Sequence, residues 1–230
     1  MKRCCILFVA VALFAFGAQL PSQEKKAPAG IVVDKEARTV TIDCKMAPRK
    51  VFKGKDDIYP LEVIATWPYP KGKKAHETIV TIDEAIKPSD VHQALESLGL
   101  KAGKPVMGDG NPMGPALTVY FLVNDSTGLP RKVTLDRAMV DSKNGKPFPK
   151  NIEWRFTGST MTQPDPGKTE KIYGGDFSGT FLVIFPVTSE TVLQTEFTIK
   201  QEGVMKLEVN PKVMPKEGTS VKLVIEAAKK

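Results

Sequence analysis

Residues 76–105 read HETIVTIDEAIKPSDVHQALESLGLKAGKP, and this stretch decides how the chain folds. Residues 76–82 contain Thr, Ile and Val, which favour an extended strand. The stretch also holds both histidines of the chain, His76 and His92. Because imidazole titrates near neutral pH, we expect any functional site to involve this strand and the helix that follows it.

A short amphipathic helix is predicted after the strand. Ser89 is suited to cap its N-terminus, and Asp90 is favoured in the first turn by the helix dipole. Gly99 is placed to end the helix. The apolar positions repeat with the helical spacing i, i+3, i+4, i+7 and are Val91, Ala94, Leu95 and Leu98. This spacing predicts a helix with one face packed on a sheet.

The rest of the chain alternates short β-type runs with turns. Asn144-Gly145 is a hairpin signal, and the Gly-Gly-Asp of residues 174–176 predicts a turn. We expect strands at 31–33, 38–44, 61–67, 76–82, 117–123, 131–135, 152–157, 179–185, 192–199, 203–209 and 219–226. The pattern predicts an α+β, β-rich fold, an antiparallel sandwich or barrel-like sheet with one short covering helix.

The N-terminus has the features of a secretory signal. Lys2 and Arg3 precede an uncharged apolar run at 4–16, and small residues for cleavage follow. The run is shorter than the roughly 20 residues that span a bilayer, so an uncleaved anchor is the alternative interpretation. We therefore predict a signal helix at residues 1–18, an exported chain in the periplasm or outside the cell, and no membrane span after cleavage.

Cysteine usage limits the chemistry of the exported chain. Cys4 and Cys5 leave with the signal, which leaves Cys44 as the single cysteine. No cysteine follows the apolar run, so a lipoprotein is not expected. Alternation in residues 39–44 places Cys44 with apolar neighbours, where a small buried hydrophobe is expected. An iron–sulfur cluster normally needs four thiolates, so a single chain cannot hold one.

Charge and length restrict the partners. Removing Lys2 and Arg3 lowers the formal net charge from +7 to +5. The lysines are scattered and do not alternate with aromatic residues, so we expect no nucleic-acid binding. Residues 19–29 are polar with two prolines and are expected to form a flexible leader. Residues 30–230 are long enough to form a single domain with a real core.

Three groups of residues resemble one known family. The first lies in residues 76–105, with His76-Glu77-Thr78, Lys87-Pro88-Ser89-Asp90-Val91-His92 and Gly103-Lys104-Pro105. The others are Trp154-Arg155-Phe156-Thr157-Gly158-Ser159, and Pro215 with Gly218-Thr219-Ser220-Val221. Together they resemble the YdjY-type domain of exported bacterial proteins. The resemblance implies export and one β-rich domain, points to His76, Glu77 and His92, and implies no particular activity.

Metal binding is one interpretation of these residues. His76-Glu77 matches the start of the zinc-protease motif, but position 80 is Val where a second histidine is required. A metal held by His76 and His92 needs the strand end and the helix start to converge, and a third ligand from elsewhere. We expect no cofactor, with a divalent metal at these two residues as the alternative.

General acid–base chemistry is a second interpretation. His92 has Glu96 at i+4 on the same flank of the helix. No nucleophile can be singled out, because Ser89 is better explained as a cap and Gly158-Ser159 lacks the glycine pattern of a nucleophile elbow. No catalytic residue is therefore assigned.

A structural role is the third interpretation, and it is the one we favour. His76, Glu77 and His92 are then members of a polar network that holds a strand, a loop and a helix together. Trp154 and Phe156 share one strand face and are expected in the core, while Arg155 faces the other way.

The candidate ligand or structural site comprises His76, Glu77, Lys87, Asp90, His92 and Arg155. Lys87 and Arg155 are included because they are able to attract an anion. We expect an exported, non-enzymatic binding or structural module whose partner is an extracytoplasmic protein or a small molecule. The alternative function is a metal-dependent or hydrolase-like enzyme that uses His76, Glu77 and His92.

Overall fold

A computed structural model describes residues 27–49, 58–150 and 152–228. The predicted signal helix at 1–18 and most of the predicted leader at 19–29 lie outside these residues. Within the described part of the chain, no helix is long and apolar enough to cross a membrane.

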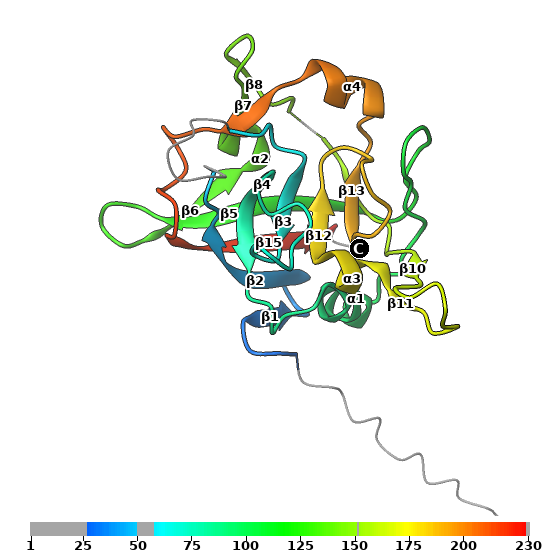
Figure 1. The fold of residues 1–230 in the computed structure, drawn as a ribbon. Helices are drawn as coiled ribbons and strands as arrows, with labels where there is room; N and C mark the ends of the chain where they lie inside the picture. The colour runs from blue at the N-terminus through cyan, green and yellow to red at the C-terminus, as the bar shows by residue number, and fades with distance from the viewer. Residues whose placement is uncertain (1–26, 50–57, 151, 229–230) are drawn as a thin grey trace, which may run out of the picture.

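The centre of the described chain is a closed, barrel-like sheet of eight strands (Figure 1). Around the ring they are β2 (Thr39–Met46), β15 (Ser220–Ala227), β5 (Ala116–Asn124), β9 (Trp154–Phe156), β13 (Leu193–Thr195), β12 (Thr180–Val183), β3 (Val63–Thr66) and β4 (Thr78–Ile82). β4 pairs back with β2 and closes the ring. The β3–β4 and β12–β13 pairs are parallel, and the other pairs are antiparallel. The β-rich, barrel-like prediction is confirmed.

Alternation along the strands fills the barrel. In β2, every second residue is buried, and these residues are Val40, Ile42, Cys44 and Met46. Asp43 and Lys45 between them are exposed. Side chains just fill the interior of an eight-stranded barrel, so one period-two strand pattern supplies one wall of the core.

Helix α1 (Pro88–Ser97) begins earlier than the sequence suggested. Lys87 is the N-cap residue, and its backbone N–H donates to Oδ2 of Asp90 at 2.9 Å. The prediction that Ser89 caps the helix is wrong, because Pro88 takes the first helical position, where its missing N–H costs nothing. The prediction for Gly99 is confirmed: it follows the helix with a φ of 78°.

The buried face of α1 packs across one end of the barrel. Its buried residues are Pro88, Val91, Ala94 and Leu95. The helix contacts β2, β12 and the short helix α3 (Gly174–Ser178), which lies beside it in Figure 1. The sequence predicted residues 174–176 as a turn; instead they begin this one-turn helix.

The remaining elements flank the barrel. β1 (Ile31–Asp34) pairs with β2, and β6 (Pro130–Thr134) pairs with β5. The smaller sheets and helices are β10 (Met161–Thr162) with β11 (Ile172–Tyr173), β14 (Leu207–Val209) with β7 (Met139–Asp141) and β8 (Lys146–Pro147), α2 (Leu135–Ala138) and α4 (Ile199–Val204). The hairpin predicted at Asn144-Gly145 is confirmed between β7 and β8.

Two expectations about helices differ from the structure. Residues 203–209 were expected to form one strand, but they begin with the end of α4 and only continue as β14. Thr198 caps α4 by accepting a hydrogen bond from the Gln201 N–H, a local signal that β-rich neighbours obscure. The described chain thus has three short helical segments besides the one covering helix expected.

Cys44 is confirmed as a buried residue, with 5% of its surface exposed. Its Sγ lies 3.3 Å from the carbonyl oxygen of Val221 on β15. Burial raises the pKa of the thiol to about 12, since the thiolate loses its hydration inside the barrel. The sulfur therefore acts as a small core side chain.

We expect Cys44 to resist alkylation in the folded protein. The measurement is iodoacetamide labelling at pH 8, followed by mass spectrometry, in a chain carrying Cys4→Ser and Cys5→Ser. Labelling in the native state should be roughly a thousandfold slower than in denaturant, because a pKa rise of about three units lowers the thiolate fraction by that factor. Equal rates in both conditions contradict this account of the core.

Candidate functional site

His92 lies on α1 between two polar partners. Its Nδ1 is 2.9 Å from the phenol oxygen of Tyr173, and its Nε2 is 3.3 Å from Oε1 of Glu96. The ring also makes an edge contact with Phe156 on β9, with centroids 5.0 Å apart. The imidazole is therefore held by α1, β9 and β11 together.

Tyr173 supplies the buried end of this network. Burial raises the pKa of its phenol well above the ordinary value, the charges of Asp176 and Glu96 raise it further, and the backbone N–H of Ser159 lowers it. The neutral phenol can donate to Nδ1 of His92 while Nε2–H of His92 donates to Glu96. This arrangement of protons satisfies both ring nitrogens.

A second polar contact joins α1 to α3. The backbone N–H of Ser89 donates to Oδ1 of Asp176 at 2.8 Å, and the Ser89 hydroxyl donates to Oδ2 at 2.7 Å. The Gly175 N–H donates to the Ser159 hydroxyl at 2.9 Å. A carboxylate that accepts two bonds from one residue fixes the relative position of the two helices.

Close packing completes this junction. Gly158 has a φ of 66°, and a Cβ there would lie 3.2 Å from Cε1 of His92 and 3.0 Å from Cβ of Ala102. Only glycine suits both the backbone conformation and the space. These contacts support the structural interpretation of His92, as a side chain that joins α1 to the loop after β9.

The structure does not bring His76 and His92 together. Arg38 precedes β2 and donates to the carbonyl oxygen of Leu98, after α1, at 3.2 Å. Arg49 follows β2 and donates to the carbonyl oxygen of His76 at 2.8 Å. β2 has eight residues, so about 23 Å separates its two ends. The two histidines therefore belong to opposite ends of the barrel.

The end that contains His76 has its own polar network. Burial lowers the pKa of Arg49, while the nearby carboxylates of Glu208, Glu217 and Glu77 raise it. The Arg49 backbone N–H also donates to Oε1 of Glu217 at 2.8 Å. The ring of His76 packs on Tyr69 with centroids 5.3 Å apart.

Glu77 is paired within the same network. Lys74 lies between two carboxylates, with Nζ 2.8 Å from Glu77 and 2.5 Å from Glu62. Burial lowers the pKa of Lys74, but hydrogen bonds and charges from Glu62 and Glu77 outweigh it, so the net shift is upward. Glu77 thus already has a cationic partner.

No metal site emerges from the described residues. Among residues 27–49, 58–150 and 152–228, no group of three or more His, Cys, Asp or Glu side chains is arranged to hold a metal ion. One ion cannot contact both His76 and His92 across the length of β2. Metal binding by this protein therefore stays a prediction without a defined ligand set.

The other predicted site residues, Lys87, Asp90 and Arg155, make polar contacts with nearby residues and, within the described chain, not with His76 or His92. Lys87 is exposed, and its backbone N–H is bound by the side chain of Asp90. Arg155 pairs with Glu196 and Glu153, each at 2.5 Å, and the hydrogen bond that it donates to Glu196 is the main cause of its raised pKa. Arg155 lies on the strand between Trp154 and Phe156, both buried, and is not part of the His92 junction.

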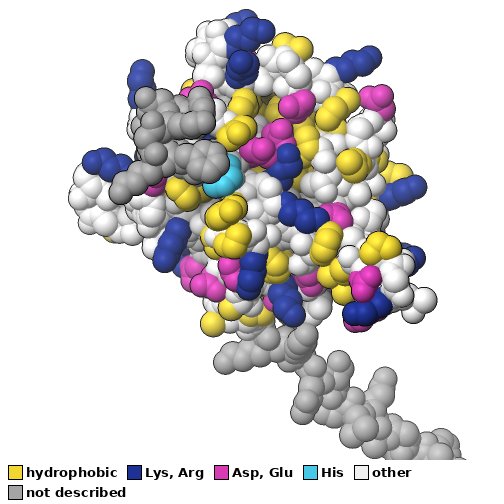
Figure 2. All heavy atoms as spheres, in the orientation of Figure 1, with side chains coloured by type: hydrophobic (Ala, Val, Ile, Leu, Met, Phe, Trp, Pro, Cys, Tyr) yellow, Lys and Arg dark blue, Asp and Glu magenta, His cyan; other side chains and the backbone are white. Residues whose placement is uncertain are grey.

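Charges of both signs are interspersed on the face of the molecule that Figure 2 shows. Figure 2 shows Lys and Arg side chains standing singly around one face, with Asp and Glu side chains between them. This distribution gives that face no continuous basic patch, which nucleic-acid binding normally requires. The absence of nucleic-acid partners remains a prediction.

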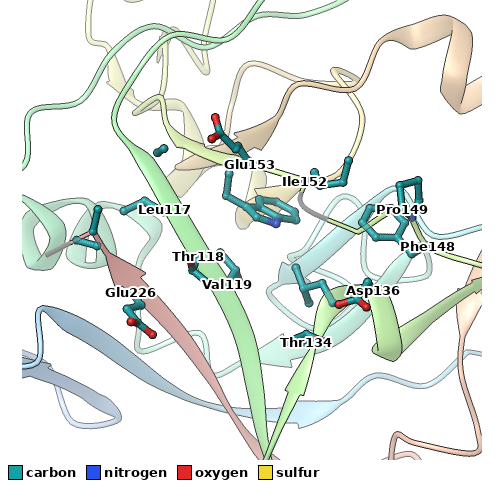
Figure 3. Close-up of a pocket in the computed structure, with 15 residues that line it drawn as sticks. Leu117, Thr118, Val119, Thr134, Asp136, Phe148, Pro149, Ile152, Glu153 and Glu226 are labelled. Carbon is teal, nitrogen blue, oxygen red and sulfur yellow. The ribbon is translucent and has the colours of Figure 1, made fainter.

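A cleft that the sequence did not indicate lies at the edge of β5. The first part of β5 pairs with β9 through Ala116 and Leu117, and its second part pairs with β6 from Tyr120 onward. Neither β6 nor β9 pairs with Thr118 and Val119, which lie between the two registers. The wall of the barrel therefore divides at this point (Figure 3).

The cleft has a volume of about 430 Å³. Its apolar lining includes Leu117, Val119, Leu135, Phe148, Ile152 and Trp154. The ionisable side chains that the described residues contribute to its lining are all acidic: Asp136, Glu153 and Glu226. Figure 3 shows that these carboxylates come from different elements around the cleft, since Glu226 lies on β15, Asp136 follows β6, and Glu153 precedes β9.

The sequence does not reveal this cleft, because the cleft depends on the order of the strands in the sheet. The strands at 117–123, 131–135 and 152–157 were predicted, and an acidic residue lies at or beside the end of the last two. That local signal is weak, because charged residues at strand ends are usually solvated. Only the pairing of β5 with two different partners along one edge identifies the cleft.

These features define a class of protein, a small closed β-barrel with a helix across one end and a cleft of ligand size in its wall. The sequence profile of the YdjY domain matches residues 31–226, and the chain therefore belongs to the YdjY domain family. Searches of curated proteins and of solved structures gave no significant match. Family membership confirms the resemblance seen in the sequence and assigns no activity.

We expect Tyr173→Phe to change how stability depends on pH. Loss of the bond to His92 should lower the free energy of unfolding by about 1 kcal/mol at pH 8. The raised pKa keeps the folded phenol neutral while the unfolded phenol ionises above about pH 10, so stability is full below that pH and falls above it by up to about 1.4 kcal/mol per pH unit. The Tyr173→Phe variant has no phenol at this position, so its stability does not fall with pH for this reason.

The difference in the free energy of unfolding between the unmodified chain and Tyr173→Phe should therefore become smaller between pH 10 and pH 11. Urea unfolding followed by circular dichroism at pH 8, 9, 10 and 11 measures it. A constant difference across that range contradicts a buried, neutral phenol at residue 173.

Proposed function

We propose that this chain is an exported, non-enzymatic binding module whose ligand occupies the cleft beside β5. The observation that carries the proposal is the division of the barrel wall at Thr118 and Val119, which gives a cleft of about 430 Å³ with an apolar floor. Small-molecule sites typically have volumes of about 300–1,000 Å³ and mostly apolar linings. Of the two ligand types expected from the sequence, a small molecule fits such a cleft better than a protein.

The scaffold around the cleft favours binding. β5 pairs with β15 on its other edge, so the floor of the cleft belongs to the closed barrel. Trp154 and Phe148 are 2% and 1% exposed, which fixes their positions by packing. A preformed site on rigid strands binds with a smaller loss of conformational entropy than a site on free loops.

The alternative function, a metal-dependent or hydrolase-like enzyme using His76, Glu77 and His92, has weaker support. Catalysis by these residues requires them to lie within hydrogen-bond reach of one substrate. His76 and Glu77 lie beyond one end of β2, with Arg49 and Lys74, and His92 lies at the other end. Glu77 is paired with Lys74, and His92 with Tyr173 and Glu96, whereas Nδ1 of His76 is buried with no hydrogen-bond partner in the described part of the chain.

Export is part of the proposal and is supported by the sequence. Lys2, Arg3 and the apolar run at 4–16 have the composition of a secretory signal. The family match begins at residue 31, after the predicted signal and leader. We place the mature module in the periplasm or outside the cell.

Expression of the complete chain in a bacterial host should yield a processed protein outside the cytoplasm. Mass spectrometry of the extracytoplasmic fraction should find an N-terminus close to residue 19, because cleavage follows the small residues at 17 and 18. A chain lacking residues 4–16 should stay in the cytoplasm. Full-length protein in the membrane fraction contradicts cleavage and favours the uncleaved anchor.

Binding in the cleft can be tested with the neutral, apolar dye N-phenyl-1-naphthylamine. Its fluorescence should rise saturably with the protein, because the dye leaves water for an apolar site. Ala116→Trp should remove most of this signal, since Ala116 is exposed and lines the cleft, so the larger side chain occupies the ligand's space.

Ser126→Trp is the matched control. Ser126 is exposed in the turn after β5 and does not line the cleft. This variant should bind the dye as the unmodified chain does. No saturable binding, or the same binding in both tryptophan variants, sinks the proposal.

A further inference from the structure

The charge of the cleft beside β5 has one sign. Asp136, Glu153 and Glu226 line it, and among residues 27–49, 58–150 and 152–228 no Lys, Arg or His does. The chain as a whole carries a net charge of +7. An acidic lining is therefore not a general property of this surface but a local feature of the cleft.

Two of the carboxylates are held from outside the cleft. Arg155 pairs with Glu153 at 2.5 Å, and Lys132 lies 3.7 Å from Glu226. Neither basic residue belongs to the lining. Lys132 also lies over the ring of Tyr120, 3.7 Å from its centroid. These contacts position the carboxylates at the rim.

The third carboxylate has no such partner. Asp136 lies in the first turn of α2 and makes no ion pair with any residue in the described parts of the chain. It is half-buried, so a cation that enters the cleft gains an interaction that water screens only in part. Trp154 and Phe148 also line the cleft, but they are only 2% and 1% exposed, so they contribute its apolar floor and no open ring face for a cation.

A second concave region offers a comparison. It has a volume of about 810 Å³ and lies over β2, β4, β5 and β15. Its lining carries both signs of charge, and Asp43 pairs with Lys222 at 2.6 Å. In this region both partners of the ion pair lie in the lining, whereas the basic partners of Glu153 and Glu226 lie outside the lining of the cleft beside β5 and Asp136 has no basic partner among the described residues.

The width of the gap in β5 decides the size of the occupant. Only Thr118 and Val119 lack a strand partner on this edge. Strands in globular proteins are usually about 3–10 residues long, so a gap of two residues disfavours an added peptide strand between β6 and β9. The occupant is therefore a small molecule.

We propose that the ligand of this cleft is a small organic cation, an ammonium or guanidinium group on an apolar body, with Asp136, Glu153 and Glu226 around the charge. The inference rests on the proposed binding function and adds the chemical class of the ligand. The apolar body lies on the floor, and the cationic group lies at the acidic rim.

Three ligands of one shape test the inference. They are 4-phenylbutylamine, 4-phenylbutanol and 4-phenylbutyrate, which are cationic, neutral and anionic near pH 7. Isothermal titration calorimetry on the full chain should show the amine binding about tenfold more tightly than the alcohol, a ratio expected when two or three partly exposed charge pairs contribute. The carboxylate should not saturate. The ratio should fall in 0.5 M NaCl, because salt screens these pairs.

Two isosteric variants test whether the preference for the amine over the alcohol comes from the carboxylates of the cleft. Asp136→Asn and Glu226→Gln should each lower the ratio of amine to alcohol affinity while leaving the affinity for the alcohol unchanged. Asp43→Asn, in the second concave region, is the matched control and should leave the ratio unchanged. Thermal melts of all variants establish that each one folds.

The outcomes separate the two proposals. Equal affinity for the amine and the alcohol, with loss of both in Ala116→Trp, overturns the cationic ligand and keeps the binding function. Amine binding that Asp136→Asn and Glu226→Gln leave unchanged also overturns it, because the charge is then recognised elsewhere. If none of the three ligands binds while N-phenyl-1-naphthylamine still does, the cationic ligand is overturned and the binding function stands; if the dye does not bind either, both proposals fail.

Discussion

The antiparallel pairing of Cys44, Lys45 and Met46 on β2 with Ile82, Thr81 and Val80 on β4 closes the barrel. Without it, both strands would present a free edge, which is the usual starting point for misassociation of sheets. Only residues 83–87 connect the end of β4 to the start of α1, so the helix lies across the end of the barrel that β4 reaches. The buried position of Cys44 is a direct consequence of closure, because the closed ring removes its sulfur from water.

Closure also explains why the two histidines act separately. β2 and β4 run along the barrel wall, so residues before β4 and residues after it lie at opposite ends. His76 therefore contacts Arg49 and Tyr69, whereas His92 contacts Tyr173, Glu96 and Phe156. Each set of contacts holds connecting segments against one end of the barrel. Two polar networks thus support one sheet, and neither needs the other.

The cleft beside β5 arises from the same rules of pairing. A strand edge can serve two partners in succession only if they meet it at different positions, and β9 and β6 leave Thr118 and Val119 between them. The side chains at this division are those of the barrel core, so the floor is apolar. Residues at the ends of the surrounding strands meet water, so the rim is polar. The geometry requires only that the rim residues be polar. That three of them are acidic is a property of this sequence.

The sequence by itself determined the elements, because period-two and 3.6-residue patterns act locally. The strands around residues 39–46, 116–124 and 220–227, the helix up to Gly99, the hairpin at Asn144-Gly145 and the buried Cys44 all follow from such patterns. Only the tertiary structure decided what these elements bring together. Strand order separated His76 from His92, Asp176 engaged Ser89 from 87 residues away, and the shared edge of β5 created the cleft. Contacts between distant segments depend on the closure of the whole sheet, and no local pattern encodes that closure.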